Sequence, residues 1–155
     1  MVFRMRGQGA TEYLVLLAVV LIIALVSIAL LGFFPGLATD AKITQSNSYL
    51  RGEARPFAVL EHSISSGTAT LVMQNTEGAG MLRVTNITMG DATPEGLPVT
   101  FAPGEVRTLT LTNYSDGTGG TPGSVYDATI KIYYTTSNGV NNTQFGTKGL
   151  TGKYS

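Results

Sequence analysis

The chain has 155 residues, and only 13% of them are charged, about half of the ~25% that is usual in soluble domains. Its formal net charge is +0, so the charge balance does not favour nucleic acid or an acidic substrate as a partner. It contains no cysteine, which excludes a disulfide framework, a thiolate metal site, a cysteine nucleophile and a cysteine lipid anchor.

Residues 13–34 form a run of 22 positions without Asp, Glu, Lys, Arg, Asn or Gln. As an α-helix this run would measure ~33 Å, enough to cross the ~30 Å hydrocarbon core of a bilayer. Arg4 and Arg6 precede it, so the positive-inside rule places the N-terminus in the cytoplasm and the chain after the run outside. A plain anchor, or a long signal peptide cut after the weak small-x-small sequence "GLA" at 36–38, is the simplest interpretation.

Glu12 stands directly before the apolar run. A carboxylate costs ~2.5–3.5 kcal/mol at the centre of a membrane helix and less near the headgroups, where this one would lie. A plain anchor gains nothing from such an acid. The position makes sense if the helix later leaves the lipid and the carboxylate then meets a cationic group.

The segment "RGQGATEYLVL" resembles the class III signal sequence of archaeal type IV pilins. That family has a short basic leader, Gly before the cut, Gln as the first mature residue and Glu at mature position five. Gly7, Gln8 and Glu12 match in identity and spacing, as does Leu16, whereas Ala10 stands where many relatives have Ser. The resemblance implies that a prepilin peptidase cuts between Gly7 and Gln8 and removes residues 1–7 as a leader.

The resemblance also assigns a role to Glu12. In type IV pilins this acid pairs with the free N-terminal amine of a neighbouring subunit, which here is the amine of Gln8. Archaellins, the related motor filaments, usually lack the acid, so Glu12 favours an adhesion pilus. The simple alternative is a glutamate that only suits the positive end of the helix dipole. An assembly ATPase and a membrane platform protein are the further partners that the family implies.

Residues 8–51 are expected to form one long helix, which anchors the precursor in the membrane and lines the filament core after assembly. Pro35 removes a backbone hydrogen bond and clashes with the preceding turn, so a kink or local melting is expected there. Asp40 and Lys42 indicate that the chain has left the membrane, and Gly52 is expected to end the helix. The second half would then pack on the following domain.

From residue 52 to 155 the pattern changes to alternating segments rich in Val, Ile, Thr, Tyr and Phe. Clusters of Gly, Pro and Asn separate segments 57–64, 68–75, 81–89, 97–101, 106–114 and 128–136. Six or seven short strands predict an antiparallel β-sandwich head, and hence an α+β chain. The expected inner face comprises Leu71, Met73, Leu82, Val84, Ile87, Leu109, Leu111, Ile130 and either Ile132 or Tyr133.

Three Asn-x-Ser/Thr sequons begin at Asn86, Asn113 and Asn141. Each is a candidate acceptor for an N-linked glycan if the head is secreted. A Thr-rich chain also supplies such sequons by chance, so one to three real sites are expected.

No enzyme is expected. The lone His62 lies in a predicted strand, and the acidic residues form neither an EF-hand nor a convincing acid–base pair. We expect no cofactor and no metal, with a loop calcium site from Asp91, Glu95 or Asp116 as the minor alternative.

These features together predict a structural subunit of an extracellular archaeal type IV pilus, used for surface adhesion, whose precursor resides in the cell membrane. The subunit would bind itself in a helical homopolymer and would not bind nucleic acid. The main alternative is a monomeric extracellular binding module that an uncleaved helix holds in the membrane. A weaker one is a prepilin-like anchor for a solute-binding assembly.

Overall fold

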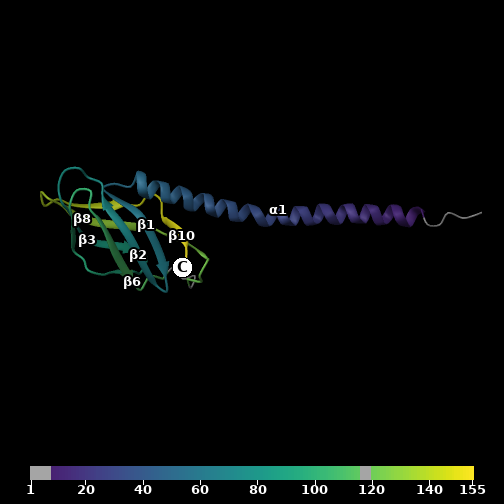
Figure 1. The fold of residues 1–155 in the computed structure, drawn as a ribbon. Helices are drawn as coiled ribbons and strands as arrows, with labels where there is room; N and C mark the ends of the chain where they lie inside the picture. The colour runs from purple at the N-terminus through teal and green to yellow at the C-terminus, as the bar shows by residue number, and fades with distance from the viewer. Residues whose placement is uncertain (1–7, 116–119) are drawn as a thin grey trace, which may run out of the picture. The chain divides into compact units, whose positions relative to one another are not determined.

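The computed structural model describes residues 8–115 and 120–155, without the side chains of Gln8 and of residues 33–35. The expected leader with Gly7, and the calcium candidate Asp116, therefore lie outside the described residues. The described chain contains one helix, α1 (Gln8–Gly52), followed by ten antiparallel strands (Figure 1). The chain divides after Asp40 into two compact units.

Helix α1 is assigned as helix from Gln8 through Pro35 to Gly52 without interruption. Local melting at Pro35 is therefore not seen, whereas a kink there stays a prediction. The helix is long and apolar enough to cross a membrane, a criterion that a signal sequence would also meet. It ends at Gly52, the residue expected to end it, and so runs one residue beyond the expected range 8–51. Its last twelve residues, 41–52, or about three turns, belong to the compact unit of the head.

The strands form two four-stranded sheets and one two-stranded sheet, all antiparallel. The first sheet has the order β1-β2-β6-β4, the second β5-β3-β8-β9, and the small one β10-β7. The bounds are β1 Phe57–Ser65, β2 Thr68–Asn75, β3 Leu82–Met89, β4 Thr93–Pro94, β5 Val99–Phe101, β6 Val106–Thr112, β7 Val125–Ala128, β8 Ile130–Thr136, β9 Asn141–Phe145 and β10 Leu150–Lys153.

The expected strands all exist, but their number was too low. Each of the six expected segments contains a strand, with β2 at its expected bounds and β5 beginning two residues late, at Val99. Four strands were missed: β4, β7, β9 and β10. They are short, and β9 ("NNTQF") and β10 ("LTGK") lack the alternation of apolar residues on which strand prediction depends. The cluster "SNGVNN" after segment 128–136 is expected to be a turn, but its last two residues belong to β9, which begins at Asn141.

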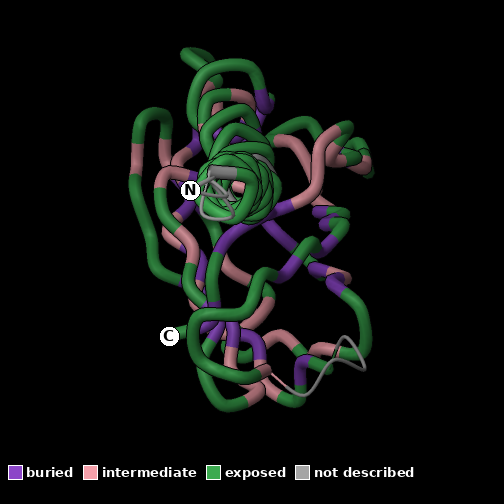
Figure 2. Tube along the Cα trace, turned by 90° about the vertical axis from the view of Figure 1, so that its right-hand side faces the viewer, coloured by how far each residue is buried: buried purple, intermediate pink, exposed green. Residues whose placement is uncertain are grey.

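The core of the head follows the alternation of buried and exposed residues along the strands (Figure 2). All the residues expected on the inner face are buried, and Ile132 rather than Tyr133 takes the ambiguous position. One hydrophobic cluster joins residues of all three sheets with Leu50 at the end of α1. The packing of residues 41–52 on the head, expected from the sequence, is thus confirmed for Leu50.

Candidate functional site

The sequence motif at the start of α1 is partly visible. Among the described residues α1 begins at Gln8, and Glu12 is the fifth residue from there. The helix dipole favours a carboxylate near a helix N-terminus. Glu12 is exposed, so its side chain is also accessible to a partner from outside the unit.

The apolar run that follows is uncovered on all sides within its unit. Every described residue from 9 to 32 is exposed (Figure 2). Leu14, Val15 and Leu16 are 61%, 64% and 65% exposed, although successive helical side chains point about 100° apart. Exposed apolar surfaces larger than a few hundred Å² mark protein–protein or membrane interaction sites.

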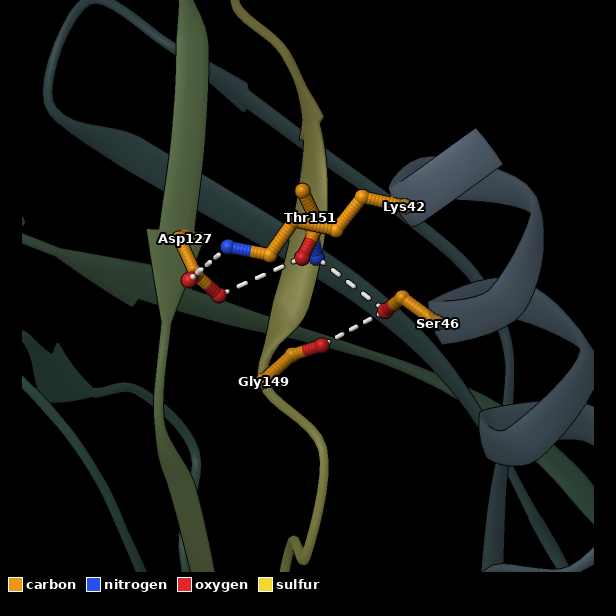
Figure 3. A network of polar contacts seen from close by, with 5 residues as sticks. All are labelled: Lys42, Ser46, Asp127, Gly149 and Thr151. Carbon is orange, nitrogen blue, oxygen red and sulfur yellow. Dashed lines mark hydrogen bonds and ion pairs between the residues drawn. The ribbon is translucent and has the colours of Figure 1, made fainter. Parts of the chain in front are cut away.

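The last turns of α1 meet the head through a polar network (Figure 3). Lys42 Nζ forms an ion pair with Asp127 Oδ2 of β7 at 2.7 Å. Ser46 is buried, and its hydroxyl donates to the carbonyl oxygen of Gly149 at 2.5 Å and accepts the backbone N–H of Thr151 in β10 at 3.2 Å. The hydroxyl of Thr151 in turn donates to Asp127 Oδ1 at 3.2 Å. This network connects α1, β10 and β7.

His62 connects the same helix end to β1 and β7. Its Nδ1 lies 2.7 Å from the hydroxyl oxygen of Tyr126, and its Nε2 lies 3.0 Å from Asn47 Oδ1. Burial, and secondly the positive charge of Arg51, lower the pKa of His62. Burial, and secondly Tyr114, raise the pKa of Tyr126 to about 12. Both rings are therefore neutral at pH 7, and both nitrogens of His62 are already engaged.

Gly152 in β10 makes room for the ring of Tyr126. A Cβ at position 152 would lie 2.6 Å from Tyr126 Cζ, and the ring cannot retreat freely because Tyr154 and His62 pack against it edge to face. We expect Gly152→Ala to destabilise the head by about 1–3 kcal/mol through overpacking. Thermal unfolding should show a melting temperature lower by several degrees.

Gly78→Ala is the matched control for this substitution, because nothing lies within 4 Å of a Cβ at Gly78. Equal melting temperatures for the two variants would contradict the packing described for Tyr126.

The three sequons lie on the surface of the head. Asn86 is exposed in β3, Asn113 is exposed just after β6 in a left-handed conformation (φ 59°), and Asn141 is exposed at the start of β9. The side chain of Asn141 accepts a hydrogen bond from Thr135, and that of Asn86 accepts the N–H of Ile87. Their exposure is compatible with glycan attachment at each of them.

No group of three or more His, Cys, Asp or Glu side chains that would hold a metal occurs among residues 8–115 and 120–155. Glu105 has a structural role instead: it accepts the N–H of Ala102 and the Nε–H of Arg107, both at 2.7 Å. The bond from Ala102 is the main reason why the pKa of Glu105 is lowered.

The sequence motif and the polar network differ in how they could be found. Gly7, Gln8 and Glu12 are close in sequence, and their spacing can be read directly. Asp127 follows Ser46 by about eighty residues in the sequence, and Thr151 follows it by about one hundred. No local pattern marks these three residues. No known family model matches the chain, and no curated protein sequence matches it either.

Proposed function

We propose that the chain is a structural subunit of an extracellular archaeal type IV pilus, which polymerises through residues 8–51 and serves in surface adhesion. The observation that carries this proposal is the helix segment 9–32, which is apolar and exposed on all sides. Lipid covers it in the precursor, and identical helices of neighbouring subunits cover it in the filament. A helix apolar all round is typical of a fully buried position.

Glu12 supplies the register of the proposed filament. In a core of apolar helices an unpaired carboxylate is costly, and a pair with the amine of Gln8 in a neighbouring subunit removes that cost. Only one axial offset between two helices brings the two groups together. The pair therefore selects an arrangement more than it adds stability.

The other elements of the proposal follow from this assembly. A prepilin peptidase cuts after Gly7, and an assembly ATPase and a membrane platform protein move the subunit from the membrane into the filament. The head faces outward, where Asn86, Asn113 and Asn141 are open to glycans. We further propose that its two four-stranded sheets face each other as a β-sandwich, since their buried side chains join one cluster.

Mass spectrometry of filaments sheared from the source cells tests the cleavage and the polymer together. We expect an abundant chain that begins at Gln8 and has lost residues 1–7 with Arg4 and Arg6. That loss leaves eight basic residues against ten acidic ones, a formal charge of −2. A peptide that contains a sequon and has a mass above that of its amino-acid sequence would locate a glycan.

A chain that begins at Met1 and stays in the membrane fraction would overturn the proposal. It would favour the monomeric binding module held by an uncleaved helix, and it would leave the position of Glu12 without a function.

A further inference from the structure

The interface between the end of α1 and the head combines polar contacts with the packing of Tyr49 and Leu50 on the core. Within residues 41–52 only Ser46 and Leu50 are buried, and of these two only Leu50 has an apolar side chain. Lys42 and Ser46 bond to β7 and the β10 segment (Figure 3), and the hydroxyl of Tyr49 bonds to that of Thr147. The polar part of this interface is sensitive to charge and protonation.

His62 is the group in this interface whose charge changes nearest to neutral pH. A neutral imidazole has one N–H donor and one acceptor nitrogen. The two neighbours match this state: Nε2–H donates to Asn47 Oδ1, and Nδ1 accepts the hydroxyl proton of Tyr126. Protonation turns Nδ1 into a donor as well, and Tyr126 must then accept and direct its own proton elsewhere.

The surroundings of His62 oppose a positive charge overall. A hollow of about 320 Å³ beside it is lined by Arg51 of α1, Glu61 of β1, Tyr126 of β7 and Lys153 of β10. Two of these side chains are cationic and one is anionic, so their sum disfavours an imidazolium. Tyr126 stays neutral, and the hollow gives water and protons a route to the ring.

We propose that His62 is a proton-sensitive latch that holds the end of α1, residues 41–52, against the head. The latch is closed while His62 is neutral. Protonation removes the acceptor at Nδ1 for the hydroxyl of Tyr126 and adds a positive charge beside Arg51, while Nε2–H still donates to Asn47. Residues 41–52 then loosen from β1 and β7, and the head gains freedom relative to the helix that carries it.

The direction of the pH dependence follows from the lowered pKa. The unfolded or undocked state binds a proton at about pH 6.5, whereas the docked state binds one only at lower pH. Docking of residues 41–52 on the head is therefore strongest above about pH 6.5 and weakens as the pH falls from there toward the lowered pKa of His62. The inference rests on contacts within residues 41–155 and holds whether or not the chain forms a filament.

Distance measurement between two spin labels on the full chain in detergent micelles tests the latch. The chain has no native cysteine, so Ser48→Cys and Thr108→Cys place labels only at these two exposed positions of α1 and β6. We expect a single narrow distance distribution at about pH 7.5 and an additional, longer and broader population at about pH 5. Nitrogen chemical shifts of the imidazole follow the protonation of His62 in the same samples.

The matched variant is His62→Gln, which keeps a polar side chain but does not titrate. It should show the same distances at both pH values, and Asn47→Ala should show the longer population already at the higher pH. Unchanged distances in the wild-type chain at pH 5, with His62 protonated or still neutral, would overturn the latch. An equal pH response in His62→Gln would overturn it as well.

Discussion

Replacing Glu12 with alanine is expected to remove pili from the cell surface while the precursor is still inserted and cut. The apolar segment 13–34 and the residues around the cleavage position are unchanged, so membrane insertion and processing should proceed. In the proposed filament, however, the amine of Gln8 would be left unpaired among apolar helices. Removing one partner of a buried ion pair costs about 3–5 kcal/mol, which corresponds to a loss of at least a hundredfold in assembly.

The measurement is the ratio of sheared, polymerised subunit to processed subunit in the membrane. Glu53→Ala removes another exposed carboxylate, just beyond the helix end, and should leave this ratio near that of the wild type. Normal pili from Glu12→Ala cells would refute the role assigned to Glu12. Mass spectra of the sheared subunit should show Gln8 with a free N-terminal amine. Cyclisation of Gln8 to pyroglutamate would remove the amine with which Glu12 is proposed to pair.

The parts of the fold that the sequence predicts are those with strong local patterns. The helix over residues 8–51 rests on a long apolar run, and β2 ("TATLVMQN") rests on clear alternation that yields alternating burial. In contrast, Gln144 is the one buried residue of β9 ("NNTQF"), and β4 is two residues long and contains Pro94. Such strands form because neighbouring strands offer them hydrogen bonds, which is tertiary information.

The same distinction applies to the candidate sites. The spacing from Gly7 to Glu12 is a property of six consecutive residues and can be recognised without a structure. The role of His62 cannot, because a lone histidine in a strand indicates no partner. Its contacts come from Asn47 on α1 and Tyr126 on β7, fifteen residues before it and sixty-four after it. Only the fold brings these three side chains together.

Gln144 is expected to be the polar residue on which the stability of the head depends most. It lies in β9, at the edge of one four-stranded sheet, and faces Phe57 in β1, at the edge of the other. Its Oε1 accepts the N–H of Phe57 and its Nε2 donates to the C=O of the same residue, both at 2.8 Å. Phe57 is fully buried, so water cannot replace either bond. The amide thus acts as a substitute for a neighbouring strand.

Gln144→Leu should therefore lower the free energy of unfolding by about 2–6 kcal/mol, since two buried backbone groups would each lose a partner worth about 1–3 kcal/mol. In urea, followed by tyrosine fluorescence of the full chain in detergent, the midpoint should fall by more than about 1 M. Gln74→Leu is the control, because Gln74 makes one bond to the carbonyl of Gly104 near the surface. Its effect should stay below about 1 kcal/mol.

Gln144→Glu separates the donor from the acceptor in this pair. At neutral pH the carboxylate still accepts the N–H of Phe57, but it cannot donate to the carbonyl oxygen and carries a charge in a buried site. Below about pH 4 the protonated acid regains a donor, so the stability deficit relative to the wild type should shrink as the pH falls. A deficit that stays constant or grows on acidification would show that the amide fills space rather than pairing both groups of Phe57. The two bonds between Gln144 and Phe57 also join the edges of the two sheets. A large loss of stability in the Gln144 variants would therefore support the proposed sandwich.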